Sequence, residues 1–340
     1  MSLRVVEARS ETLAVVRGVL RPPLSSVDRG AMVTVWLDGE LGYCASADLS
    51  ARGLQDAADR AVAWALAARG RGLGLASAPW RAPELGARYR GPDDEPLPAR
   101  EALIDLLRDE AVAMALDPRI VHSSAVLGAT EVVQGLWIDG ELVADQRFRF
   151  VEPNLEVTAC DGGRSQTRTL GGQYNGFSQQ GGRAVLGASG LIGGGARIAG
   201  QALELLYAPN CPAGARDLLL SPDQMMLQIH ESIGHPLELD RILGDERNFA
   251  GTSFVTPDMF GSYRYGSPLL DVSFEPGVPG EVASYAVDDD GAVAHPVRLI
   301  EKGVLKRALG GELSQLRARA LGWPIGGVAE LTFVVRHCPP

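Results

Sequence analysis

The chain has little lysine, no excess of basic residues and no long run of apolar residues. Lys302 and Lys306 are the only lysines among 340 residues, which we interpret as a coding bias toward arginine. The net charge of -10 and the pI of about 5.1 argue against a general nucleic-acid binder, which normally shows a basic surface. No stretch of the sequence is long and apolar enough to span a membrane. We therefore expect neither a nucleic-acid partner nor a membrane partner.

Cysteine is also scarce, and this excludes a disulfide framework. The four cysteines are widely scattered, and no C-x-x-C pair occurs. Charges interrupt the apolar residues at the N-terminus, so this segment does not resemble a signal peptide. We expect free thiols and a cytoplasmic protein.

Several common catalytic patterns are missing as well. There is no serine-elbow motif and no pair of catalytic carboxylates. Residues 161–195 are rich in glycine, but they contain no G-K-[ST] and do not follow the dinucleotide fingerprint after a clear strand. We interpret this segment as a glycine-rich turn that leads into a helix, in preference to a nucleotide-binding loop.

Histidine is scarce too, but it is concentrated in one place. Two of the five histidines fall in the six-residue run H-E-S-I-G-H, as His230 and His235, with Glu231 beside the first. Neutral imidazole is a common zinc ligand, and a carboxylate beside two imidazoles is the usual general base of a metallohydrolase. The alternative is that these are two ordinary histidines at a helix end.

The spacing of the two histidines is unusual. The common zinc-protease motif places its histidines four residues apart, on one helical face. A separation of five residues points them roughly 140° apart on an ideal α-helix. A metal site therefore requires a broken or bulged helix between His230 and His235.

The flanking sequence predicts such a break. A capping-box pattern at residues 221–224 with Pro222 in the first turn predicts a helix over residues 222–234. Gly234 and Pro236 end it, and Pro236 biases His235 away from the right-handed helical region. We expect His235 to lie at a kink that turns it back toward His230, with a second short helical segment from Pro236. The apolar positions offered for burial are Met225, Met226, Leu227, Ile229 and Ile233.

Zinc needs at least one further protein ligand and an open position for water. The available candidates are Glu238, Asp240, Cys211, His295 and the terminal pair His337 and Cys338. None of them has a compelling spacing. We expect Glu238 either to orient an imidazole or to pair with Arg241.

The wider pattern predicts an α+β fold. Strands are expected at residues 12–20, 31–45, 119–127, 131–138, 141–151 and 217–220, and helices at 54–68, 98–116, 196–206 and 308–320. Asp38-Gly39 and Asp139-Gly140 signal hairpin turns. Residues 1–210 are predicted to form an N-terminal α+β domain with a helix pair and an antiparallel sheet. Residues 211–340 would begin a β-rich C-terminal domain that carries the metal-motif helix.

The motif and several later segments resemble the TldD/PmbA metalloprotease family, on its TldD side. The residues that carry this resemblance are residues 230–240, Gly251-Thr252-Ser253, residues 284–291, residues 299–305 and the Cys211-Pro-Ala-Gly run. The order of the N-terminal helix and strands is also similar. The resemblance extends from the first strands to about Gly322.

This resemblance implies a zinc-dependent cytoplasmic peptidase that hydrolyses unfolded or flexible peptides inside a closed dimer. His230 and His235 would bind Zn²⁺, and Glu231 would activate a zinc-bound water. The partner would be a PmbA-like subunit without the metal motif, or a second copy of the chain.

The sequence departs from the family after Gly322. Family members continue well past residue 340, and the resemblance places the third zinc ligand, a cysteine, in that further stretch. We therefore expect a truncated or frame-shifted product with an incomplete C-terminal domain. The alternative function is a non-catalytic peptide-binding or partner subunit that lacks the third ligand. A further alternative is an unrelated zinc peptidase in which a downstream glutamate is the third ligand.

Overall fold

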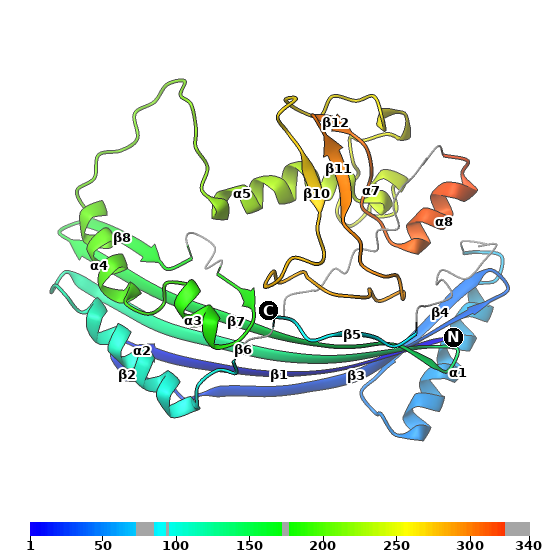
Figure 1. Ribbon diagram of the computed structural model, residues 1–340, viewed down its shortest axis with the longest axis horizontal. Coiled ribbons are helices and arrows are strands. Elements are labelled where there is room, and N and C mark those ends of the chain that lie inside the picture. Colours follow the sequence, from blue (N-terminus) through cyan, green and yellow to red (C-terminus); the bar gives the residue numbers. More distant parts are fainter. Residues whose placement is uncertain (73–84, 93–94, 172–176, 324–340) are drawn as a thin grey trace.

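The computed structural model describes residues 1–72, 85–92, 95–171 and 177–323. Its base is a long curved sheet that is mainly antiparallel, and most C-terminal elements lie above one face of it (Figure 1). The α+β fold class is confirmed. Among the described residues, no helix combines the length and the apolar character that a membrane span requires.

Four strands form most of the sheet. These are β1 (Ser2–Val16), β3 (Leu24–Leu37), β6 (Ile120–Ile138) and β7 (Glu141–Asp161). Within the described chain, the strand order is β4-β3-β1-β6-β7-β5, with β4 at Glu40–Ser46 and the parallel edge strand β5 at Ala87–Tyr89. Three short strands pair beside this path: β2 (Val19–Leu20), β8 (Arg164–Thr169) and β9 (Gln179–Gln180).

The two predicted hairpin turns are confirmed. Asp38 and Gly39 have φ values of 51° and 89°, and Asp139 and Gly140 have 48° and 89°. Two consecutive positive φ values match the right-handed twist of the strands that they join, and Asp-Gly tolerates them well.

Several strand boundaries were wrong. A third turn of the same kind, at Arg17-Gly18, divides the predicted strand 12–20, and β1 begins at Ser2. The strands expected at 119–127 and 131–138 are one continuous strand, because Gly128 pairs in register with Glu152 and makes no turn. Residues 217–220 are exposed and irregular, so the strand predicted there is absent.

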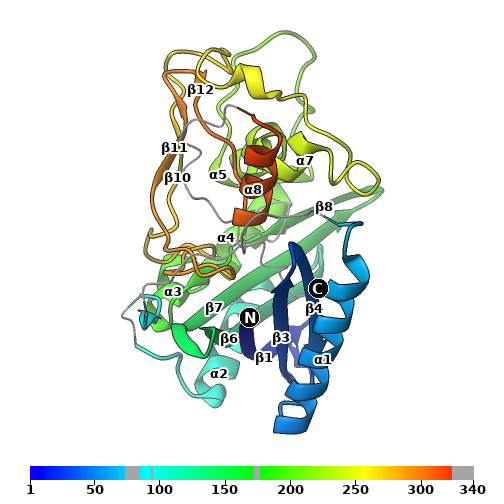
Figure 2. The same cartoon turned by 90° about the vertical axis from the view of Figure 1, so that its right-hand side faces the viewer.

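Helices cover the two ends of the sheet (Figures 1 and 2). The helix α1 (Ala51–Ala68) begins at Ser50, whose side chain accepts a hydrogen bond from Gly53 N, and packs its alanines against β3 and β4. At the other end, α2 (Arg100–Met114), α3 (Arg183–Ala188) and α4 (Gly194–Leu205) share one core with the sheet, including Leu107, Leu155 and Ile198.

The glycine-rich segment is explained by this packing. Glu110 on α2 is buried, and its carboxylate accepts hydrogen bonds from Gly193 N (2.6 Å) and Gly195 N (2.8 Å) at the start of α4. A Cβ on Gly195 would lie 2.6 Å from Glu110 O. The amides that a phosphate would need are therefore used by a protein carboxylate, in agreement with the prediction of a turn.

The C-terminal elements form a second core above the sheet. They comprise α5 (Pro222–Ile229), a π-helical turn (His230–Gly234), α6 (His235–Leu237), α7 (Leu239–Leu243), a 3₁₀ turn (Pro257–Met259) and α8 (Glu312–Ala320). Three short strands, β10 (Val272–Phe274), β11 (Val297–Glu301) and β12 (Val304–Leu305), form a small sheet beside them. Leu237, Ile300 and Leu305 are fully buried in this core. The last helix is confirmed, but it begins at Glu312, four residues later than predicted.

Candidate metal centre

The two motif histidines lie at the two ends of a π-helical turn. The backbone N–H of His235 donates to the carbonyl oxygen of His230, which is a hydrogen bond between residues five apart. Such a bond stacks residues i and i+5 in the way that an α-helix stacks residues i and i+4. The inserted residue therefore removes the angular mismatch that the five-residue spacing would cause in an α-helix.

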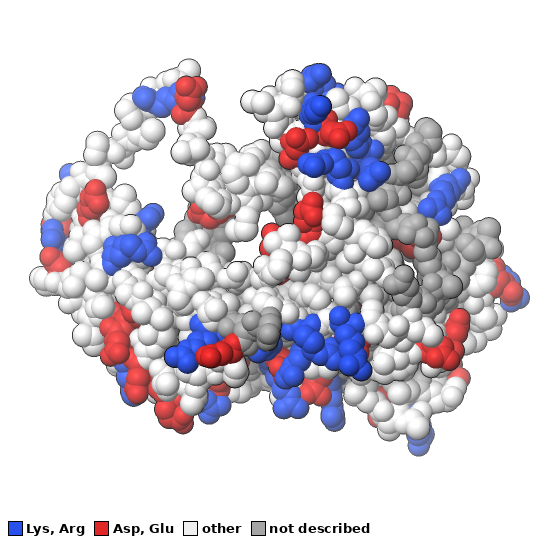
Figure 3. All heavy atoms as spheres, viewed as in Figure 1, with Lys and Arg blue, Asp and Glu red and all other residues white. Residues whose placement is uncertain are grey.

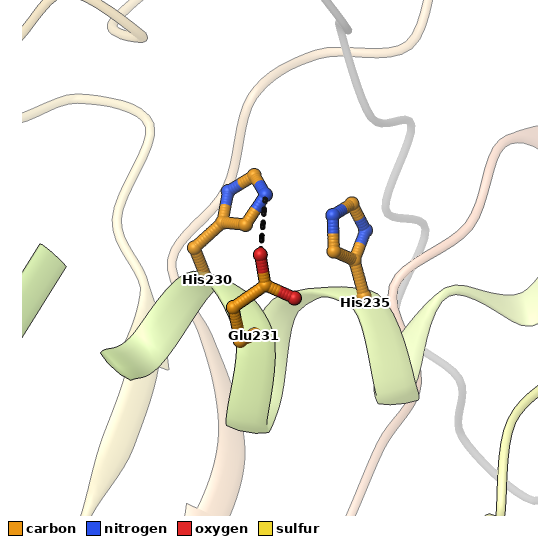
Figure 4. Close-up of side chains that lie close together, drawn as sticks. All are labelled: His230, Glu231 and His235. Atoms are coloured by element: carbon orange, nitrogen blue, oxygen red, sulfur yellow. Dashed lines mark ion pairs between the residues drawn. The ribbon is translucent and has the colours of Figure 1, made fainter. Parts of the chain in front are cut away.

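The turn brings the three motif side chains together (Figure 4). The rings of His230 and His235 lie edge to face with centroids 4.2 Å apart, and Glu231 Oε1 lies 4.0 Å from His230 Nε2. One donor atom from each side chain lies within 4.8 Å of the other two. The side chains of His230 and Glu231 are 58% and 62% exposed, whereas that of His235 is 30% exposed. The group is therefore open to solvent on the side of His230.

The ring of His235 contacts the ion pair between Glu238 and Arg241. Its Nδ1 lies 2.8 Å from Glu238 Oε1 and 3.1 Å from Arg241 Nη2. Because the carboxylate contact is the shorter, we place the ring proton on Nδ1, which leaves the lone pair on Nε2. Arg241 donates to the other Glu238 oxygen and to Ala250 O. Glu238 thus makes both of the contacts considered from the sequence.

The helix differs from its prediction in three ways. His235 keeps right-handed helical angles (φ -58°, ψ -43°) despite the following proline, so the repair is a π-turn and not a proline kink. The side chain of Ser221 contacts Asp223 and does not cap the helix. No residue of α5 is buried, and of the five predicted apolar positions only Ile233, in the π-turn, enters the core. Burial therefore acts on the turn and not on the helix before it.

The other candidate ligands do not join the group within the described residues. Cys211 is exposed in the segment that arches away between α4 and α5 (Figures 1 and 3), and His295 is exposed in a loop. Asp240 accepts a hydrogen bond from Arg241 N next to it. His337 and Cys338 lie outside the described residues.

The donor set suits zinc. Imidazole nitrogens and a carboxylate are ordinary zinc ligands, and a tetrahedral ion with bonds of about 2.0–2.1 Å holds its nitrogens about 3.4 Å apart. The donor atoms here lie within 4.8 Å of one another, and the side chain of His230 is 58% exposed. The orientation of His235 by a carboxylate is also typical of zinc-ligating histidines.

Comparison with known proteins shows which family the chain belongs to. The profile described as PmbA/TldA metallopeptidase domain 1 matches residues 2–65, and the profile of the PmbA/TldA metallopeptidase C-terminal domain matches residues 213–331. Together they cover just over half of the chain. These profiles describe domains of a metallopeptidase family, and the chain belongs to that family, the PmbA/TldD family.

Curated relatives carry the same description. A metalloprotease of Methanocaldococcus jannaschii is 34% identical over 109 residues, covering 32% of this chain and 22% of that protein. A TldD-homologous metalloprotease of Buchnera aphidicola is 28% identical and covers 64% of this chain and 43% of its own length. A TldD-homologous metalloprotease of Haemophilus influenzae is 24% identical, and the match covers 93% of this chain and 63% of that protein. The chain thus spans less than two thirds of these relatives.

Solved structures share the fold at low identity. A protein of Bacteroides thetaiotaomicron, described as a candidate modulator of DNA gyrase, superposes with a TM-score of 0.66 at 13% identity, over 97% of this chain and 70% of that one. TldE from Thermococcus kodakarensis superposes with a TM-score of 0.56 at 14% identity, over 94% of this chain and 68% of that one.

Proposed function

We propose that this chain is the metal-bearing subunit of a zinc-dependent cytoplasmic peptidase that acts on unfolded or flexible peptides. The observation that carries the proposal is the π-turn, because it collects His230, Glu231 and His235 on one side of an otherwise α-helical segment. A five-residue spacing without this turn would leave the imidazoles apart.

Each side chain has a distinct role in this proposal. His230 and His235 would hold the ion, and Glu238 with Arg241 would keep His235 oriented. Bound zinc would lower the pKa of a water molecule and polarise the scissile carbonyl. Glu231 accepts the proton from the attacking water and delivers it to the leaving amine. The side chain of Glu231 is 62% exposed, so its carboxylate is accessible to water and to a peptide.

Access to the site favours a flexible substrate. The side chains of His230 and Glu231 are more than half exposed. The residues that precede them in the sequence, 207–221 and α5, have no buried side chain. An extended peptide can therefore reach the site from solvent. The proposed partner is a PmbA-like subunit or a second copy of the chain.

A non-catalytic role remains the second candidate. Within the described residues, the metal group holds two imidazoles, and its only other donor is the carboxylate needed as the base. A chain that binds peptides or a partner subunit without retaining zinc would fit this alternative.

Metal analysis of the purified 340-residue chain tests the proposal. We expect zinc in a ratio near one per chain, lost in His230→Ala and His235→Ala because each variant removes one of the two imidazole ligands. Glu231→Gln should keep the zinc but lower the hydrolysis of an unfolded fluorogenic peptide by at least about a hundredfold, since it removes the general base.

His295→Ala is the matched control, because His295 is exposed and lies outside the group. It should leave metal content and hydrolysis unchanged. A folded chain that contains no zinc after dialysis against zinc, but still binds the peptide, would support the non-catalytic subunit instead.

A further inference from the structure

The proline after the second histidine creates a hydrogen-bonding gap inside the motif. In an α-helical segment, the carbonyl of Ser232 would accept a hydrogen bond from the backbone N–H of residue 236. Residue 236 is proline, which has no N–H to donate. The carbonyl of Ser232, which lies between the two histidines in the sequence, therefore lacks its usual α-helical donor.

A side chain from a distant segment supplies a donor to this carbonyl. The hydroxyl of Tyr265 donates to Ser232 O at 2.5 Å, across 33 residues of sequence. Burial raises the pKa of Tyr265 to about 12, with a further contribution from Tyr263. The hydroxyl thus keeps its proton, and remains a donor, throughout the neutral pH range.

Tyr265 is itself fixed in place. Its backbone N–H donates to Gly303 O (2.7 Å) at the turn between β11 and β12. Its ring packs against the core that contains Ile233 and lies 5.8 Å from the ring of Phe254 and 6.0 Å from that of Tyr263, measured between centroids. The hydroxyl therefore reaches Ser232 from a ring that backbone and side-chain contacts hold in place.

We propose that Tyr265 is a positioning residue that holds the π-turn in the register where His230 and His235 face each other. The inference rests on the proposed function as far as the metal is concerned. Tyr265 does not bind the ion or touch the peptide in this role; it acts through the backbone of Ser232. A looser turn would let the two imidazoles separate and would weaken a site that they share.

The test compares two tyrosine-to-phenylalanine variants of the full chain. Tyr265→Phe removes the hydroxyl and keeps the ring in the core. Tyr263→Phe removes the hydroxyl of the neighbouring tyrosine, for which no hydrogen bond is found among the described residues. Hydrogen exchange of the backbone amides in residues 228–238 should be faster in Tyr265→Phe and unchanged in Tyr263→Phe.

Titration with Co²⁺ gives the second readout. We expect the affinity of Tyr265→Phe to fall by about tenfold, the lower end of what changes outside the ligand shell cause. The visible absorption of the bound Co²⁺ should shift, because the ligand geometry changes. Tyr263→Phe should match the unmodified chain in both respects.

The outcomes separate the two proposals. Unchanged exchange in Tyr265→Phe overturns the positioning role, whatever the metal does. Faster exchange with unchanged Co²⁺ affinity and spectrum also overturns it, since the hydroxyl would then stabilise the turn without positioning ligands. If the unmodified chain binds no metal through His230 and His235, the proposed function fails, while the exchange experiment still decides whether Tyr265 holds the turn.

Discussion

At the scale of single residues, the site depends on contacts that sequence spacing indicates only in part. The motif itself predicted His230, Glu231 and His235 as a group, and proximity to His235 indicated Glu238. The contribution of Tyr265 had only an indirect signal: Pro236 removes a donor, but nothing local to the motif shows which residue replaces it. The hydroxyl of Ser253 is a similar case, since it donates to Pro236 O at 2.6 Å from another loop.

Glu238 should matter more for metal binding than its acidic neighbour. In Glu238→Ala, His235 loses the carboxylate that orients it. Among the described residues, Arg241 then keeps Ala250 O and a contact with the imidazole as its side-chain partners. We expect zinc affinity to fall by about 10- to 100-fold, as for other changes to residues that orient ligands. Competition with a chromophoric chelator measures this change.

Asp240→Ala is the control for this prediction. Asp240 lies two residues away, and within the described residues its side chain accepts only from the adjacent backbone N–H of Arg241. It should change zinc affinity little. Equal losses in the two variants would show that general negative charge near the site, and not the orientation of His235, sets the affinity.

At the scale of elements, one π-turn and one capped helix explain the two most unusual stretches of sequence. Propensity and capping patterns predicted a helix at 222–234 but not its hydrogen-bond register. An inserted residue in a helix is accommodated when tertiary contacts hold the turn, and Ile233, Leu237 and Tyr265 provide those contacts. The glycine-rich start of α4 has a similar explanation in its contact with Glu110.

Replacing Glu110 should destabilise the N-terminal part of the chain. Glu110 is 5% exposed and is the acceptor for two amides at the start of α4. Glu110→Ala would leave both amides without that acceptor, so we expect a loss of about 1–3 kcal/mol in the free energy of unfolding. Urea denaturation followed by circular dichroism measures it.

Asp109→Ala on the same helix is the reference, because Asp109 is exposed. Its effect should stay within about 0.5 kcal/mol, the usual range for a surface substitution. A loss for Glu110→Ala no larger than this would contradict the capping role.

At the scale of the whole molecule, residues 284–294 connect the C-terminal core to the sheet. Gln146 on β7 is 1% exposed; its amide donates to Val287 O (2.7 Å), and its oxygen accepts from Ala286 N (3.0 Å) and Val287 N (3.1 Å). Asp289 pairs with Arg4 on β1 and accepts from Gln134 on β6. The proposed division at residues 210 and 211 stays a prediction, and this contact would lie between its two parts.

The stability of the folded chain should fall as the pH rises, because Asp288 in this segment is buried. Burial raises the pKa of Asp288 from 3.8 to about 7, and the neighbouring Asp290 and Asp289 add to this effect. Between about pH 4 and pH 7 the folded chain binds more protons at Asp288 than the unfolded chain. Stability therefore falls with rising pH across this window, by at most about 1.4 kcal/mol per pH unit from this group.

Asp288→Asn tests this dependence. The amide oxygen can still accept from Asp290 N and Ala292 N, which both donate to Asp288 Oδ1, but the buried charge is gone. The variant should unfold at a higher temperature than the unmodified chain at pH 8 and show a flatter dependence between pH 4 and pH 7. Glu101→Gln, an exposed change on α2, should keep the original slope. Parallel slopes for all three proteins would refute the prediction.

The sequence by itself determined the fold class, the Asp-Gly hairpins, the helices rich in alanine and leucine, and the three motif residues. These features depend on local backbone preference and on spacing along the chain, which a sequence displays directly. It also showed that the histidine spacing needed a correction, because 3.6 residues per turn is a property of any α-helix.

Only the tertiary structure decided how that correction is made. The π-turn is held by an N–H to carbonyl bond from His235 to His230, by the burial of Ile233 and by the hydroxyl of Tyr265. These contacts come from segments that meet only in the folded chain. The contact of Glu110 with the glycine-rich turn and the burial of Asp288 have the same origin, since packing brings together residues that spacing keeps far apart.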